Sequence, residues 1–298
     1  MIDTLLNLEP PVQAALIAAV VGFTSGVIGT YFKHFLDKRA LRDKIEIEYQ
    51  YAERKKLREL IGRYHGRMLE AAERLNHRFW NLQENESKDW LNMSGEYNSP
   101  ESNYYFTTTV YRTVELLTLV RLFDSEAIFI DARIAREREL IFARFAKAFE
   151  WALTDTDLFK GISYETFWQT DHLFHDKLRL LCESCISEGK IISIDKFQER
   201  LKSSDKNLLV PLLSFFDGLR ANEKRLRWDR VVVFHLLLMA FINAFGYDIQ
   251  KSSVPNFIEI ATSIKNKPIL ENLVRWLPKL GLTKEGRNIV VAANSITV

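Results

Sequence analysis

Residues that interrupt helices are scarce in this chain, which has 12 glycines and 7 prolines among 298 residues. Strands that are joined by tight turns usually need such residues at the turns. Their scarcity therefore favours long helices, and we expect an all-α fold. The length allows one large helical domain or two smaller ones.

Cysteine is almost absent, and an excess of either charge is also missing. The only two cysteines are Cys182 and Cys185, and the formal net charge is +2. Two cysteines do not indicate a disulfide scaffold, and they fit a reduced cytoplasm. The balanced charge gives no reason to expect a nucleic-acid partner.

Motifs that bind phosphate or carry out hydrolysis are missing as well. The sequence has no Gly-x-x-x-x-Gly-Lys-Ser/Thr loop, no Gly-x-Gly-x-x-Gly, no Gly-x-Ser-x-Gly and no His-Glu-x-x-His. We therefore assign no catalytic residue and no cofactor, and we favour a protein that is not an enzyme. An enzyme whose groups converge from distant positions remains the open alternative.

One long run without charge stands out at residues 10–32, PPVQAALIAAVVGFTSGVIGTYF. About 20 apolar residues suffice to cross a bilayer as a helix. A cleaved signal peptide would have basic residues before this run, where Asp3 and Glu9 stand instead, and a small-residue cleavage site after it. A buried helix of a soluble protein would show a wider polar stripe. We predict a transmembrane helix over residues 10–32.

Basic residues lie on only one side of this run. Residues 1–9 contain no Lys or Arg, whereas Lys33, Lys38, Arg39, Arg42 and Lys44 follow the run. Positive residues beside a membrane helix stay in the cytoplasm. The predicted topology is a single pass with residues 1–9 outside and the C-terminal part in the cytoplasm. We expect the five basic residues to contact anionic lipid headgroups.

Small residues recur every four positions in the predicted membrane helix, at Ala14, Ala18, Gly22, Gly26 and Thr30. Such a stripe lets two helix backbones approach closely in lipid, where packing drives association. The stripe indicates self-association through the membrane segment. The alternative is that glycine and alanine are simply common in membrane helices.

The charged segment 33–84 continues without proline, and from Leu57 to Leu82 its apolar residues are spaced by three or four. This spacing is typical of a coiled-coil seam or of one long helix against a bundle. We expect the membrane helix to continue directly into a long helix. Packing within the same chain and a stalk that pairs with other copies both remain open.

Residues 104–280 are expected to form a cytoplasmic bundle of helices, after a loop at 85–103 that Gly95 and Pro100 mark. A second loop is expected at 154–163, and a turn followed by a short helix at 188–207. Apolar periodicity predicts the other helices over 104–123, 126–153, 164–186, 208–219, 255–265 and 268–280.

A second apolar run covers residues 231–247 and is about 17 residues long. That length is short for crossing a bilayer. We favour a buried central helix, and a second membrane pass is the alternative. The tail, residues 281–298, could be a final strand, a docked peptide or disordered.

Four residues resemble a metal site by type and spacing, namely His172, His175, Cys182 and Cys185. On one straight helix, His172 and Cys182 would be about 15 Å apart along the axis. Zinc needs all its ligands within about 2.3 Å. We therefore predict no shared metal site, unless the helix breaks between Asp176 and Leu181.

The run YYFTTTVYRTVELLTLVRLFDSEAIFID, residues 104–131, resembles a pattern in uncharacterised bacterial proteins. Those proteins pair an aromatic Ser/Thr-x-x-Tyr-Arg helix with an N-terminal membrane anchor. The resemblance implies a bacterial origin, and hence the inner membrane, together with an anchored helical body. It implies no activity and no functional residue.

Three functional hypotheses follow. The first is a non-enzymatic, membrane-anchored scaffold, sensor or partner-docking protein, whose partners are the lipid bilayer, other copies and an unidentified protein. The second is an effector that permeabilises membranes, for example in defence against phage. The third is a membrane-tethered helical enzyme.

Overall fold

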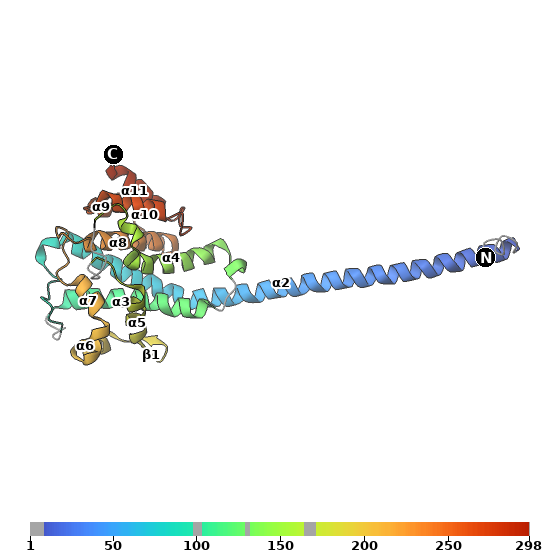
Figure 1. Ribbon diagram of the computed structural model, residues 1–298, viewed down its shortest axis with the longest axis horizontal. Coiled ribbons are helices and arrows are strands. Elements are labelled where there is room, and N and C mark those ends of the chain that lie inside the picture. The colour runs from blue at the N-terminus through green and yellow to red at the C-terminus, as the bar shows by residue number, and fades with distance from the viewer. Residues whose placement is uncertain (1–8, 98–102, 129–131, 164–170, 298) are drawn as a thin grey trace. The chain divides into compact units, whose positions relative to one another are not determined.

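The structure, a computed structural model, describes residues 9–97, 103–128, 132–163 and 171–297. These residues form ten α-helices and one two-stranded sheet, which confirms the all-α class (Figure 1). Short 3₁₀ turns connect some helices, at Glu86–Lys88, Ala132–Ile134, Asp157–Phe159, Ser204–Leu208 and Asp248–Gln250. The chain divides into two compact units, Met1–Lys55 and Lys56–Val298. We call the second unit the body.

Helix α2 (Pro10–Glu84) starts in the first unit and ends in the body. Its two prolines stand in its first turn, where the missing N–H groups need no partner. No proline follows within the helix, so the i to i−4 hydrogen bonds continue without a break. The expectation of one continuous helix over residues 10–84 is confirmed.

The second half of α2 packs inside the body. Leu60, Met68 and Leu75 are buried there. Aromatic contacts join it to α3 (Tyr104–Ala127) through Tyr64 and Phe123, whose ring centroids are 5.9 Å apart. From residue 57 to residue 82, the apolar seam therefore packs within its own chain. Residues 33–49 of the same helix are exposed.

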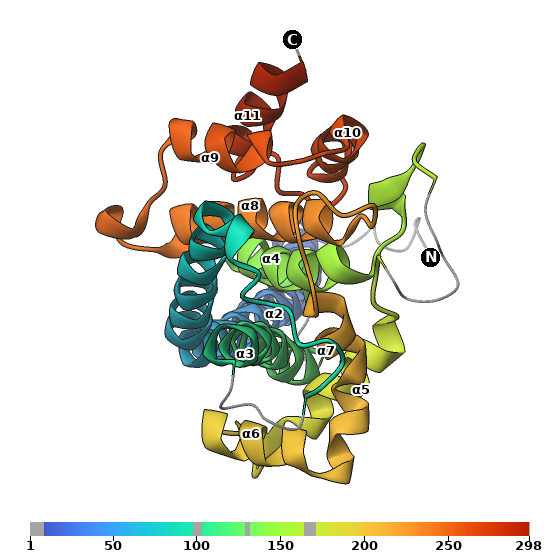
Figure 2. The same ribbon diagram turned by 90° about the vertical axis from the view of Figure 1, so that its left-hand side faces the viewer.

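Helix α8 (Arg227–Phe245) runs through the centre of the body, and its residues 227–242 are all buried. Helix α4 (Glu137–Thr154) contacts one side of α8, while α9 (Val254–Thr262), α10 (Lys267–Trp276) and α11 (Arg287–Thr297) contact the other (Figures 1 and 2). The second apolar run is thus a core helix, as we favoured.

For residues 287–297 of the tail, the strand and the disordered segment are wrong, and the docked peptide is the form found, as the helix α11. It buries Ile289, Ala292 and Ala293 while it packs on α9. The turn before it uses Gly281, whose φ of 68° is unfavourable for other residues. Burial on α9 decides between conformations that the short tail sequence left open.

Helix α3 lies between this core and a smaller layer formed by α5 (His175–Ser184), α6 (Ile194–Lys202) and α7 (Val210–Phe216). A hairpin of β1 (Ile186–Ser187) and β2 (Lys190–Ile191) connects α5 to α6, with Ile186 opposite Ile191. The hairpin was not expected. Its two-residue turn places Glu188 and Gly189 at φ values of 52° and 70°, as a type I′ turn requires.

Two helix boundaries also correct the sequence interpretation. The start of the expected helix over 126–153 is wrong, because α3 continues to Ala127 and α4 begins only at Glu137, whereas its expected end agrees with that of α4 at Thr154. The expected helix over 164–186 is also wrong in part, because α5 begins at His175 and ends at Ser184. Its first seven residues, 164–170, lie outside the described ranges.

Candidate membrane anchor and buried charge sites

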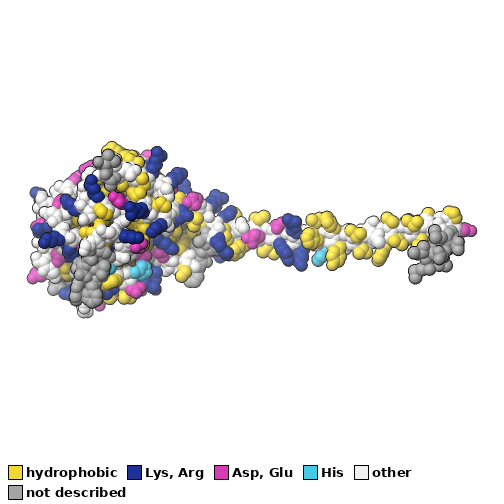
Figure 3. Space-filling model, turned by 45° about the horizontal axis from the view of Figure 1, so that its top comes forward, with side chains coloured by type: hydrophobic (Ala, Val, Ile, Leu, Met, Phe, Trp, Pro, Cys, Tyr) yellow, Lys and Arg dark blue, Asp and Glu magenta, His cyan; other side chains and the backbone are white. Residues whose placement is uncertain are grey.

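The candidate anchor is the helical segment 10–32 of α2, which carries no Asp, Glu, Lys, Arg or His. Its most apolar 18-residue window is completely unburied, and Phe23 is 74% exposed. Figure 3 shows hydrophobic side chains along this exposed helix. Each square ångström of apolar surface left in water forgoes about 25 cal/mol. By length and composition, α2 and α8 are the two described helices that could cross a membrane, and only α2 exposes its apolar surface.

Hydroxyl groups in this segment bond to the helix itself. Thr24 Oγ1 donates to the carbonyl oxygen of Val20 at 2.8 Å, and Thr30 Oγ1 donates to that of Gly26 at 2.7 Å. Lipid offers no hydrogen-bond partners, so polar groups there must be satisfied internally. These two threonines meet that requirement.

The small-residue stripe is fully exposed, from Ala14 and Ala18 through Gly22 and Gly26 to Thr30. Among the described residues, no atom beyond the helix's own neighbouring turns lies within 4 Å of where a Cβ would stand on Gly22 or Gly26. Glycine inside a helix costs about 1 kcal/mol relative to alanine. No packing against another described residue compensates for that cost.

The predicted headgroup contacts are exposed as well, at Lys33, Lys38, Arg39, Arg42 and Lys44. Just before and among them the structure exposes three large aromatic side chains, which the sequence interpretation did not use. Tyr31, Phe32 and Phe35 are 80%, 63% and 60% exposed. Aromatic rings followed by basic residues are typical of the boundary between lipid and water.

The four metal candidates do not come together. His172 precedes α5 and is buried, whereas His175 opens α5 and places Nε2 2.9 Å from Oε1 of Glu150. Burial raises the pKa of the Cys182 thiol to about 12 and also raises that of Cys185. Within the described residues no three His, Cys, Asp or Glu side chains are placed to hold a metal ion.

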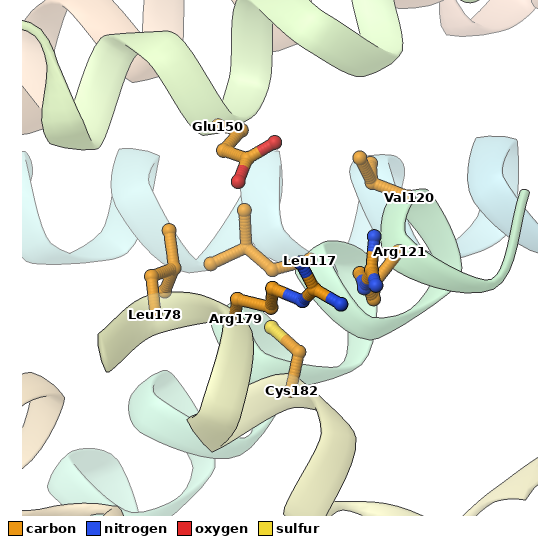
Figure 4. A pocket seen from close by; sticks show the side chains of 7 residues that line it. All are labelled: Leu117, Val120, Arg121, Glu150, Leu178, Arg179 and Cys182. Atoms are coloured by element: carbon orange, nitrogen blue, oxygen red, sulfur yellow. The ribbon is translucent and has the colours of Figure 1, made fainter. Parts of the chain in front are cut away.

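Cys182 lines a small cavity between α3, α4 and α5 (Figure 4). The cavity measures about 10 Å³, which is room for about one water molecule. Arg121 and Arg179 beside it both donate to Oε1 of Glu183, at 3.0 and 2.9 Å. A protonated thiol is a poor nucleophile. The cavity is therefore too small, and its thiol too weakly acidic, for a substrate site.

Buried ionic groups also occupy the start of α8. Arg227 Nη1 donates to the carbonyl oxygens of Ser214, Phe215 and Asp217. Asp229 Oδ1 accepts from the Lys265 amide at 2.7 Å. These groups bind other segments of the body, so Arg227 is not available to lipid headgroups.

Arg230 is the most buried member of this group, with no exposed surface. Its Nε, Nη1 and Nη2 donate to the carbonyl oxygens of Asp171, Ala152 and Asp155, at 2.7, 2.5 and 2.9 Å. Carbonyl oxygens of Ala152 in the last turn of α4, of Asp155 after it and of Asp171 thus converge on one guanidinium. In the sequence, Arg230 stands directly before the apolar run 231–247.

Comparisons with protein families, with curated proteins and with solved structures find no match for this chain. Function must therefore be argued from the chemistry of these sites.

Proposed function

We propose that this protein is anchored in a membrane by residues 10–32, with residues 1–9 outside and the body in the cytoplasm. The observation that carries the proposal is the uncharged helix over residues 10–32, whose side chains are exposed and which exposed aromatic and basic residues follow. A bilayer would cover this apolar surface, and Lys33, Lys38 and Arg39 would face its headgroups.

The role that fits best is a non-enzymatic scaffold, sensor or partner-docking protein of the bacterial inner membrane, which self-associates. The exposed glycines of the stripe support self-association, because close packing against a second helix would offset their cost. The large buried core of the body supports a stable docking platform.

Membrane fractionation tests the anchor. The full chain should stay in the membrane pellet after alkaline carbonate extraction, whereas a variant that starts at Lys33 should be soluble with unchanged helical circular dichroism. If the shortened chain remains in the pellet, the single-anchor proposal is wrong.

Topology has its own test. In the variant Lys279→Cys the new thiol is exposed, whereas Cys182 and Cys185 are buried. A membrane-impermeant maleimide should label this variant only after the cells are permeabilised. Labelling of intact cells would place the body outside and overturn the orientation.

Self-association is tested by the mass of the detergent-purified protein. Gly22→Leu combined with Gly26→Leu should convert a discrete oligomer into monomers, because the larger side chains separate the backbones. Val20→Leu combined with Val27→Leu, on the opposite side of the helix, is the matched control and should leave the mass unchanged. A wild-type monomer would reject self-association through this stripe.

The second candidate function is an effector that permeabilises the membrane, which the same exposed stripe favours because assembled helices could line an opening. Overexpression should then collapse the membrane potential, and Gly22→Leu with Gly26→Leu should prevent the collapse. An unchanged potential on overexpression of the wild type would reject this candidate.

A further inference from the structure

Arg78, on the part of α2 that lies in the body, is a buried cation that no carboxylate pairs with in the described part of the chain. It is 2% exposed. Its guanidinium carbon lies 4.7 Å from the ring centroid of Tyr105 and 5.6 Å from that of Tyr104, and Nη2 donates to Thr108 Oγ1 at 2.8 Å. Within the described residues, Nε and Nη1 of Arg78 have no hydrogen-bond acceptor.

Such an arrangement is unfavourable by itself. An arginine side chain stays protonated in proteins, so it cannot avoid the cost by losing its proton. Burying a charge without a paired and hydrogen-bonded partner costs several kcal/mol. The two aromatic rings offset part of this cost through their faces. Over the residues that the structure describes, the Nε and Nη1 donors still face no anion.

Neighbouring charged residues make the electrostatic potential around Arg78 more positive. Arg112 of α3 donates from Nη1 to the carbonyl oxygen of Arg74, which lies one turn before Arg78. Burial, and after it the nearby Arg112, lowers the pKa of Arg78. Glu115 does not balance Arg78, because its Oε1 pairs with Arg74 Nη2 at 2.5 Å. Arg74 Nε also lies 3.9 Å from Glu70 Oε1, so both of these carboxylates face Arg74 rather than Arg78.

The start of α3 adds to this potential. The helix has 24 residues and begins at Tyr104, after Asn103 accepts the Phe106 amide at 2.9 Å. The first turn of a helix carries a partial positive charge and attracts anions. Tyr104 is 62% exposed, and the guanidinium carbon of Arg78 lies over its ring, 5.6 Å from the centroid. Rotation of the Tyr104 side chain would expose the Arg78 guanidinium to solvent.

We propose that Arg78 and Arg112 form a binding site for the phosphate group of a small phosphorylated molecule, with Tyr104 at its entrance. Two guanidinium groups and a helix N-terminus match the charge and the several oxygens of a phosphate better than those of a single carboxylate. The free Nε and Nη1 of Arg78 would each donate to a phosphate oxygen. The site lies wholly in the body and does not depend on the membrane anchor.

Thermal unfolding of the full chain in a neutral detergent tests this site. The probes are inorganic phosphate, glycerol phosphate and micelles that contain phosphatidic acid, each compared with sodium chloride at equal ionic strength. A ligand at about a hundred times its dissociation constant should raise the Tm by about 5 °C. A shift with the soluble probes identifies a soluble ligand, and a shift with phosphatidic acid alone identifies a lipid headgroup.

Arg78→Met should abolish the shift while the protein still folds, because the substitution removes a buried charge that lacks a partner. Arg112→Gln should weaken phosphate affinity about tenfold. Arg275→Met is the matched control at an exposed arginine of α10 that pairs with Glu271, and it should keep the full shift.

No shift with any probe beyond that of sodium chloride would overturn the proposal. So would an unchanged shift in Arg78→Met. Arg112 is half-buried, so its variant is expected to fold even if Arg78→Met does not. If the folded Arg112→Gln variant binds phosphate as tightly as the wild type does, the proposal that Arg78 and Arg112 form the site together is wrong.

Discussion

The two apolar helical stretches of this chain, residues 10–32 and residues 231–245 of α8, contain similar side chains in opposite surroundings. Val21 in the middle of the first is 56% exposed, whereas Val233 in the second is completely buried. Both helices pass the same length and composition criterion for crossing a membrane. Apolar composition therefore indicates only that a helix is more stable away from water. Whether the protein core or a membrane covers the helix depends on the rest of the fold.

The ionic residues at the ends of the two stretches show the difference. Arg227, Asp229 and Arg230 at the start of α8 are buried, and peptide groups of other segments bind them. Lys33 and Lys38 after the first stretch are exposed. Buried charges need partners that the protein supplies, whereas exposed charges are solvated by water or headgroups. A core helix thus has flanking charges that bind other parts of the protein, whereas a candidate membrane helix has flanking charges that remain exposed.

Placing the same charge in both helices should produce the largest effects. Val233→Asp introduces an unpaired carboxylate into the core and should lower the free energy of unfolding by about 3–5 kcal/mol. Val21→Asp should leave the stability of the body unchanged. It should instead oppose membrane insertion by about 2.5–3.5 kcal/mol and shift the protein towards the soluble fraction. Urea denaturation, monitored by tryptophan fluorescence, measures the change in the free energy of unfolding. Membrane fractionation measures the change in insertion.

Val21→Leu and Val233→Leu are the matched controls for position, because they stay apolar. The comparison would fail if Val21→Asp lowered the urea midpoint of the body as much as Val233→Asp does. Residues 10–32 would then behave as a core helix.

Removing the central guanidinium should have the next largest effect. Arg230→Met leaves three buried carbonyl oxygens without their donors, so the free energy of unfolding should fall by about 3 kcal/mol. Arg230→Lys keeps one charged donor group and should lose less. Urea denaturation measures both, with exposed Arg275→Met as the control. Wild-type stability in Arg230→Met would show that these bonds do not hold α8 in place.

Much of the fold could be predicted from the sequence, because long helices without proline have a strong local signal. A break between α3 and α4 is expected at 124–125, but its observed place between Ala127 and Glu137 could not be predicted, since residues 124–139 contain no glycine or proline. In the structure, the side chain of Glu139 accepts the amide of Arg136 at 2.7 Å and fixes the start of α4. Arginine is not a usual residue at such a start, so no local signal marks this position.

Some candidate sites could also be predicted from the sequence, and others could not. The exposed stripe and the basic flank could be located from spacing alone, because they belong to one helix. Arg112 of α3 reaches the Arg74 carbonyl of α2, one turn before Arg78, only after the two helices pack. Contacts between distant segments have no periodic signal, so single-sequence reasoning does not find them.

Lowering the pH should have a smaller effect, which concerns the stability contributed by α8 and leaves residues 10–32 unaffected. His235 is buried in α8 with Nε2 3.0 Å from Asn76 Oδ1, and burial lowers its pKa to about 3. The unfolded chain binds a proton near pH 6.5, before the folded chain does. His235 therefore contributes full stability above pH 6.5, and this contribution decreases as the pH falls towards 3. Between pH 7.5 and 5.5 the expected loss is about 1.4 kcal/mol.

The measurement is the difference between wild type and His235→Gln, which keeps an amide donor for Asn76 and cannot titrate. This difference is needed because Asp124 acts in the opposite direction. Burial, and then Glu150, raises the pKa of Asp124 to about 6, so its cost in the folded state diminishes as the pH falls. His65 and His172, whose pKa values burial lowers, are present in both proteins and cancel. Residues 10–32 have no group that titrates in this range, so attachment should be equal at both pH values. Release from the membrane at pH 5.5 would mean that the titrating body, rather than the apolar segment, holds the protein there.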